Sequence, residues 1–160
     1  MQDVRIQTEN HKFKYRVNLI VLKNGKVLTI KMSNGTAYCL PGGHIELGED
    51  SRTAAIREAF EELDSEVTIS HELAIAENFY TDKAGLITHE HSFYYIVEPV
   101  TFDKIPLVNY TRTENDKGKI KEHYFEWLDI KKLSDVNLVP SFIKEKLAKD
   151  DLTFEHFIIK

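Results

Sequence analysis

Residues 43–65, with the sequence GHIELGEDSRTAAIREAFEELDS, decide the fold of this chain. Pro41 and two glycines stand directly before or at the start of this stretch, and they end any preceding strand because proline has no N–H and glycine permits unusual backbone angles. Asp50 or Ser51 can cap the helix that we expect from about Ser51 to Leu63, whose alanines, leucine and glutamates favour a helix. The stretch therefore predicts a glycine turn that leads into one helix.

On a wheel of about 100° per residue this helix divides into two stripes. The apolar stripe, which we expect to pack against a sheet, consists of Ile56, Ala59, Phe60 and Leu63. The other stripe holds Glu58, Glu61 and Glu62, which are neighbours at i, i+3 and i+4 spacing. Like charges so placed repel unless a cation joins them, and hard oxygen ligands suit Mg²⁺ or Mn²⁺. An ordinary solvated helix face is the alternative explanation of the three carboxylates.

The spacing of these residues resembles the Nudix box, in which a glycine, a glutamate and an Arg-Glu…Glu-Glu cluster recur at fixed intervals. The matching positions are Gly43, Glu49, Arg57, Glu58, Glu61 and Glu62. The resemblance implies an α/β fold, an α/β/α sandwich around a central mixed β-sheet, in one Nudix hydrolase domain over 1–160. It also implies hydrolysis of a nucleoside diphosphate linked to another group, as in a nucleotide sugar, ADP-ribose or a nucleoside triphosphate.

Two positions depart from the box. Asp64 stands where the family has a glycine, and Ser65 stands where an aliphatic residue is usual. A glycine that ends a helix usually adopts the left-handed conformation, which Asp tolerates better than most residues. We therefore expect a shifted or slightly strained helix exit with the carboxylates still in place.

The resemblance also assigns metal ligands. It implies that Mg²⁺, with Mn²⁺ as a substitute, is held by Glu58 and Glu62, with Glu61 close behind and the Gly42 carbonyl as a backbone ligand. Such a cation would reverse the repulsion between an acidic pocket and a diphosphate and would lower the pKa of a bound water.

Other box residues are expected to act by position. Gly43 and Glu49 are structural residues of the box, and Arg57 orients Glu49 through a bidentate pair or, alternatively, forms a surface salt bridge. The general base stays open between Glu58 and Glu61 within the box and Glu98, which ends an apolar strand, with Glu46 and Glu49 as secondary candidates.

Outside the box, the pattern predicts a β-hairpin over Lys12–Lys31 that turns at Asn24-Gly25. Further strands are expected over 37–40, 67–75, 92–97, 124–128 and 152–159. A second helix is expected over 140–148. Loops over 81–90 and 108–119 are candidates for substrate specificity.

Composition excludes several classes of protein. A chain of 160 residues with 42% hydrophobic and 29% charged residues is an ordinary globular domain rather than a disordered or membrane-spanning chain. The net charge of −5 argues against a nucleic-acid partner. Cys39 is the single cysteine, so no intramolecular disulfide is possible. With no signal peptide in the pattern, we expect a cytoplasmic protein with a small nucleotide-derived substrate, and an apolar C-terminal strand that can pair in a homodimer.

Competing interpretations rest on other residues. A non-catalytic nucleotide sensor on the same fold is the alternative function, although such proteins typically lose the box carboxylates. His89 and His91 resemble a transition-metal pair without a third ligand. An RNA-binding role would need lysines to converge near the site, namely Lys117, Lys119, Lys121, Lys131 and Lys132.

Overall fold

The computed structural model describes residues 2–33, 35–116 and 118–160. The strands are β1 (Arg5–Gln7), β2 (His11–Lys23), β3 (Lys26–Lys31), β4 (Tyr38–Cys39), β5 (Val67–Thr81), β6 (Ile87–Pro99), β7 (Tyr110–Asp116), β8 (Lys119–Asp129), β9 (Leu138–Val139) and β10 (Glu155–Ile159). The helices are α1 (Ser51–Leu63), the 3₁₀ helix η1 (Ile130–Asp135) and α2 (Phe142–Ala148).

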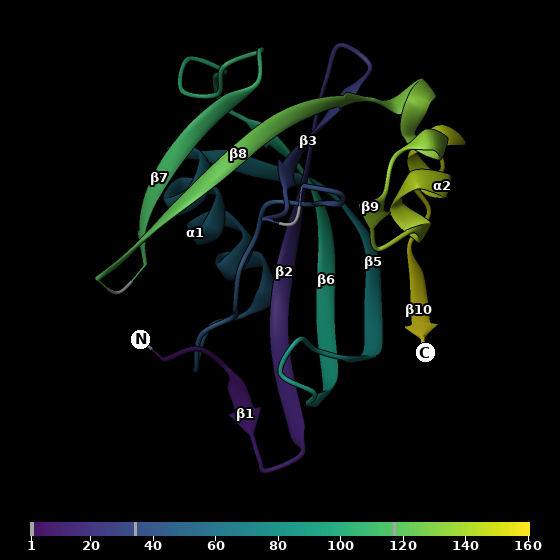
Figure 1. Ribbon diagram of the computed structural model, residues 1–160. Coiled ribbons are helices and arrows are strands. Elements are labelled where there is room, and N and C mark those ends of the chain that lie inside the picture. The colour runs from purple at the N-terminus through teal and green to yellow at the C-terminus, as the bar shows by residue number, and fades with distance from the viewer. Residues whose placement is uncertain (1, 34, 117) are drawn as a thin grey trace.

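The strands form a mixed sheet in the order β10-β5-β6-β2-β3-β4-β9. The pairs β2–β6 and β5–β10 are parallel, whereas β5–β6 and β2–β3 are antiparallel. The β7–β8 hairpin continues from β3 and extends beside α1 as a long arm (Figure 1). This arm forms one side of the pocket described below.

The central strand β2 supplies both cores of the molecule. Val17, Leu19 and Val21 join the core beneath α1, whereas Ile20 points to the opposite face and joins the core beneath α2. This alternation is the period of two expected of a strand buried on both sides. The helices lie on opposite faces of the sheet (Figure 1), so the predicted α/β/α sandwich with a mixed central sheet is confirmed.

Helix α1 has the predicted bounds, and both of its ends are capped. The Asp50 carboxylate accepts hydrogen bonds from the backbone N–H groups of Arg52 and Thr53. At the other end Asp64 adopts the left-handed conformation, with φ 52° and ψ 38°, and its N–H donates to the Phe60 carbonyl. The aspartate thus takes the backbone conformation of the missing glycine, and the predicted shift of the helix exit is wrong because the helix ends at Leu63.

The predicted orientation of α1 is wrong in part. Ile56 and Phe60 are 45% and 58% exposed, so they do not face the sheet. The buried face consists of Ala54, Ala55, Glu58, Ala59, Glu62 and Leu63. Small alanines let the helix approach the sheet closely, and the helix is turned by about one residue position relative to the prediction. This rotation buries two glutamates rather than exposing them.

The remaining predicted strands and the second helix are present. The loop expected over 81–90 is wrong in part, because β5 extends to Thr81 and β6 begins at Ile87, and β1, η1 and β9 were not predicted. The first hairpin turns at Asn24 and Gly25, which have φ angles of 51° and 72°. The segment 108–119, predicted as a loop, contains strand β7 instead, which pairs with β8 along its length. The sequence of this strand, YTRTEND, does not alternate between apolar and polar residues, so it gave no signal of a strand. Lys117 lies outside the described residues.

Strand β10 ends the sheet beside β5, as predicted for the C-terminal strand. Pairing of this edge with a second copy stays a prediction. Among the described residues, no helix has the length and apolar character needed to cross a bilayer.

Candidate active site

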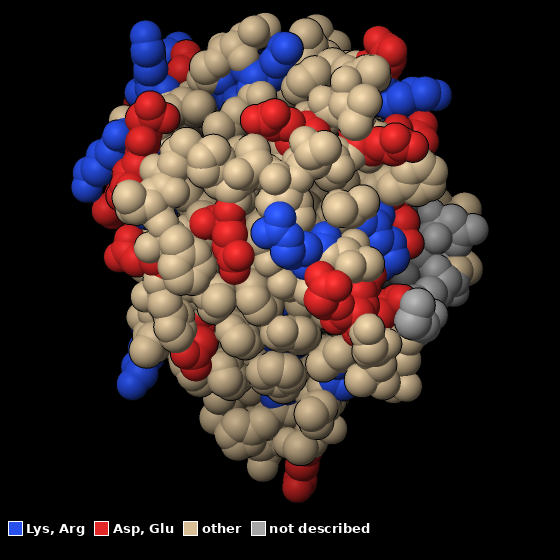
Figure 2. All heavy atoms as spheres, turned by 180° about the vertical axis from the view of Figure 1, so that it is seen from behind, with Lys and Arg blue, Asp and Glu red and all other residues tan. Residues whose placement is uncertain are grey.

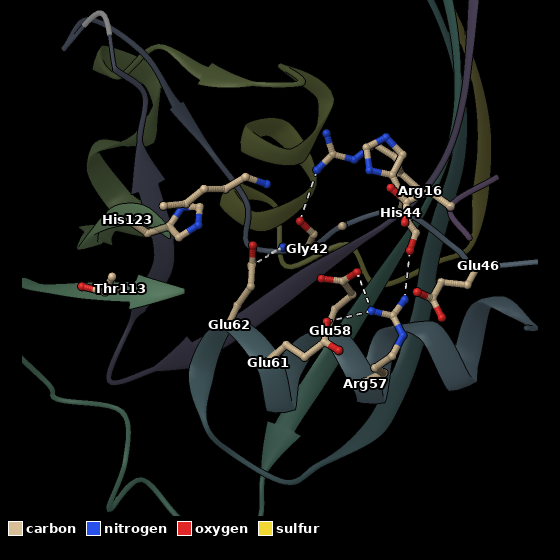
Figure 3. Close-up of a pocket in the computed structure, with 13 residues that line it drawn as sticks. Arg16, Gly42, His44, Glu46, Arg57, Glu58, Glu61, Glu62, Thr113 and His123 are labelled. Atoms are coloured by element: carbon tan, nitrogen blue, oxygen red, sulfur yellow. Dashed lines mark hydrogen bonds and ion pairs between the residues drawn. The ribbon is translucent and has the colours of Figure 1, made fainter. Parts of the chain in front are cut away.

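A pocket of about 470 Å³ lies between α1, the glycine turn, β2 and the β7–β8 arm. Figure 3 shows Glu58, Glu61 and Glu62 rising into it from α1. Thr113 and His123 lie at one end of the pocket and Arg16 lies at the other (Figure 3). The complete lining is Asp3, Arg16, Gly42, Gly43, His44, Glu46, Arg57, Glu58, Glu61, Glu62, Thr113, Lys121 and His123.

Arg57 is the hub of this site. Its Nε and Nη2 atoms donate to the two carboxylate oxygens of Glu49, both at 2.9 Å, which is the predicted bidentate pair. Its Nη1 donates to Glu58 at 2.8 Å and to Glu61 at 2.9 Å, and its Nη2 also donates to the His44 carbonyl at 2.9 Å. A guanidinium has five N–H donors, so these contacts occupy all of them. Arg57 therefore fixes the carboxylates and the turn rather than an incoming ligand.

Glu58 and Glu62 are only 7% and 6% exposed, which is unusual for carboxylates. The Oε2 atom of Glu62 accepts a hydrogen bond from the Gly42 N–H at 2.7 Å. Burial raises the pKa of Glu58 to about 7, against the opposing effect of the Arg57 guanidinium. The fold thus keeps two acidic groups out of water, and hydrogen bonds from Arg57 and from the Gly42 N–H offset part of the cost.

The glycine turn is shaped around these carboxylates. A Cβ atom on Gly43 would lie 2.2 Å from the Oε1 atom of Glu58. Gly42 has a φ angle of +140°, and a Cβ atom there would lie 2.2 Å from the Val17 carbonyl oxygen. Gly42 has no room for a side chain because the overlap is with the backbone of β2, whereas a side chain at Gly43 would have to displace the Glu58 carboxylate.

The donors at this site suit a hard divalent cation in chemistry. They are three carboxylates and the Gly42 carbonyl, all oxygen ligands. As the side chains stand, no three His, Cys, Asp or Glu side chains in the described part of the chain surround a common metal position. The Glu58 and Glu61 carboxylates share the Arg57 guanidinium instead, and the Gly42 carbonyl accepts from Arg16 at 3.2 Å. The donor atoms are therefore of the type that a hard divalent cation prefers. To bind it, these oxygens must give up their present contacts with Arg57 and Arg16.

The buried Glu58 carboxyl predicts a pH dependence of stability in the presence of a chelator. Because the pKa of Glu58 is raised in the folded protein above its ordinary value of 4.5, the folded state binds the proton more tightly than the unfolded chain. The free energy of unfolding should therefore fall by about 3 kcal/mol as the pH rises from below 4.5 to above 7. Urea denaturation at a series of pH values measures this, and Glu58→Gln should remove most of the decline. An equal decline in the variant would assign it to other groups.

Several residues of the pocket were not predicted. Arg16 and His44 are bridge partners between β2 and the turn, and Lys121 and His123 come from β8. Burial, followed by the charge of Arg16, lowers the pKa of His44 to about 4, so its imidazole is neutral near pH 7. The only sequence signal for the β8 residues was their i, i+2 spacing, which is informative only once the arm is known to be a strand.

Other candidates are not brought to the pocket. Glu98 is exposed near the end of β6. Because β5 and β6 are antiparallel, it pairs with Thr68 near the start of β5. It does not line the pocket, so this placement does not support Glu98 as the base. Burial raises the pKa of the Cys39 thiol to about 11, which does not favour a thiolate nucleophile.

The structure also shows where the histidines and the described lysines of the competing interpretations lie. His89 and His91 lie on β6 among aromatic rings, with His89 stacked on Phe79. Of the lysines that would mark an RNA-binding face and whose side chains the structure describes, Lys121 lines the pocket, whereas Lys131 and Lys132 do not. Figure 2 shows acidic and basic side chains interspersed over one face, and its described side chains form no continuous basic field.

Residues 12–148 match the family described as NUDIX domain. No curated protein matches the chain in sequence.

Several solved structures share its fold. A MutT protein from Bacillus halodurans is 19% identical, with 91% of this chain and 89% of that chain covered and a TM-score of 0.61. An ADP-ribose pyrophosphatase from Streptococcus suis is 14% identical, with 91% and 98% covered and a TM-score of 0.58. A UDP-X diphosphatase is 12% identical, with 95% and 68% covered and a TM-score of 0.57.

At these identities the solved structures establish the fold, whereas the family match extends over most of the chain and includes the whole pocket-forming helix. The match begins inside β2 and ends with α2, so it includes both cores of the sandwich. The glycine turn, the capped helix and the Arg57 hub all lie within it. The chain belongs to the Nudix hydrolase family.

Proposed function

We propose that this protein hydrolyses the diphosphate linkage of a nucleoside diphosphate joined to another group. The observation that carries the proposal is the pair of buried glutamates, Glu58 and Glu62, held at a pocket between a side-chain-free turn and the Arg57 hub. Buried acids in a pocket are typical of functional sites, and burial raises the pKa of one of them, Glu58. Family membership and the named activities of the structural neighbours agree with this chemistry.

The proposal assigns roles to the residues of the pocket. Glu58, Glu61, Glu62 and the Gly42 carbonyl would hold a divalent cation, Mg²⁺ or Mn²⁺. When bound, it would neutralise diphosphate oxygens and lower the pKa of a water molecule. Arg57 holds Glu58 and Glu61 in position through its two Nη1 hydrogen bonds.

The general base is proposed to be a glutamate of the box rather than Glu98. Glu58 is buried and has a pKa of about 7, close to the value that suits a base at neutral pH. Glu61 is more exposed, with a side chain that is 46% accessible, and is the second candidate. Coordination to a cation makes a carboxylate a weaker proton acceptor, so the base would be whichever of Glu58 and Glu61 the cation leaves uncoordinated.

A substrate panel tests the function. The purified protein with Mg²⁺ or Mn²⁺ is expected to release a nucleoside monophosphate from at least one member of a panel of ADP-ribose, nucleotide sugars, dinucleoside polyphosphates and nucleoside triphosphates. Addition of excess chelator should abolish the release, because an acidic pocket repels a diphosphate. Liquid chromatography of the products measures both outcomes. Calorimetric binding of the same compounds without any product would identify a nucleotide sensor instead.

A further inference from the structure

We infer that Lys121 and His123 of the β7–β8 arm bind a phosphoryl group beyond the diphosphate, so that the preferred substrates carry three or more phosphates in a row. The inference rests on the proposed function and selects among its substrate classes. It also assigns to the arm a recognition role that the box does not provide.

The guanidinium of Arg57 is fully engaged with groups of the protein itself. All five N–H donors of Arg57 are directed to Glu49, Glu58, Glu61 and the His44 carbonyl. Arg57 therefore has no donor directed at a ligand. Positive groups that meet an anionic substrate must come from other elements that line the pocket.

Two basic residues line the pocket from strand β8. Lys121 and His123 are alternate residues of β8, so their side chains share the face of the strand that lines the pocket. The hydroxyl-bearing Thr113 lines the same end from β7. Figure 3 shows His123 and Thr113 at one end and the glutamates of α1 between that end and Arg16.

The opposite end of the pocket contains buried polar atoms. The Nε atom of Arg16 and the Nε2 atom of His44 are buried, and neither has a hydrogen-bond partner among the described residues. Buried polar atoms are nearly always paired, so these atoms indicate that a polar ligand reaches this end as well. Polar groups therefore lie at both ends of the pocket, with Glu58, Glu61 and Glu62 between them. This arrangement fits an elongated anionic ligand.

The charge and volume of the pocket indicate the chemical class of this ligand. The divalent cation proposed at Glu58, Glu61 and Glu62 would offset the charge of a diphosphate, so the additional lysine charge and imidazole at one end favour additional negative charge on the ligand. A lysine ammonium binds phosphate as a point charge, whereas a neutral sugar calls for paired donors and acceptors. The pocket volume of about 470 Å³ is within the range of small-ligand sites. These features fit a polyphosphate chain better than a nucleotide sugar.

The test compares two substrates in the full-length protein with Mg²⁺, a nucleoside triphosphate and ADP-ribose. Lys121→Gln and His123→Gln are each expected to lower kcat/KM for the triphosphate by about 10-fold to 100-fold, mainly through KM. They should change kcat/KM for ADP-ribose by less than about threefold. Lys121→Arg should restore most of the triphosphate activity because it restores the charge.

The matched control is Lys131→Gln, since Lys131 is exposed on η1 and does not line the pocket. Thermal melts of all variants identify any loss of folding. Turnover of ADP-ribose without turnover of triphosphates by the wild-type protein would overturn the inference, as would equal effects of Lys121→Gln on both substrates or no effect on either. A wild-type protein that hydrolyses neither these substrates nor any other member of the panel would overturn the proposed function instead.

Discussion

Glu62→Gln is expected to lower kcat by at least about 100-fold while the protein stays folded. The amide is nearly isosteric with the carboxylate, and its oxygen can still accept the Gly42 N–H that Glu62 accepts at 2.7 Å. What is lost is one negative charge at a buried position, where charge interactions are little screened. A deficit of about 3 kcal/mol in stabilisation of the transition state corresponds to a loss of this size.

Initial-rate kinetics with the best substrate of the panel measure this effect. Glu66→Gln is the matched control, because Glu66 is exposed directly after the helix and does not line the pocket. Circular dichroism and thermal melting establish that both variants are folded. Unchanged turnover in Glu62→Gln would remove Glu62 from the reaction.

Gly42→Ala is expected to destabilise the protein by at least about 3 kcal/mol. The new Cβ atom would lie 2.2 Å from the Val17 carbonyl oxygen and 2.9 Å from the Asn18 Cα atom. Both of these atoms belong to the backbone of β2, so no side-chain rotation relieves the overlap. The φ angle of +140° adds strain for any residue with a Cβ atom.

Gly48→Ala separates strain from overlap. Gly48 also has a positive φ angle, of +82°, but a Cβ atom there would meet no atom within 4 Å. We expect it to cost about 1 kcal/mol, which is the backbone contribution alone. Urea denaturation of both variants measures the difference, and similar losses at the two positions would show that close packing of the turn on β2 is unimportant.

The sequence was sufficient to predict the helix and its ends, because these depend on local chemistry. Asp50 caps the first turn through its own side chain, and Asp64 ends the last turn in the left-handed conformation that Asp tolerates. The bidentate pairing of Arg57 with Glu49 was also predictable, since it joins residues eight positions apart within one motif.

The orientation of the helix was not predictable from its own residues. A wheel assigns carboxylates to solvent, but packing of alanines against the sheet turned Phe60 outward and Glu62 inward. The basic end of the pocket was also inaccessible to sequence reasoning, because β8 brings Lys121 and His123 to a helix about 60 positions away in the chain. Such proximity is decided by sheet topology and leaves no local pattern.

The alternation of β2 between two cores has a consequence for how this chain can diverge. Val17 and Leu19 serve one layer and Ile20 serves the other, so a single-residue insertion or deletion within the strand would send each side chain to the wrong layer. Changes in length during evolution are therefore restricted to the connecting segments. Relatives that act on different compounds would be expected to differ in loop length while this strand keeps its frame.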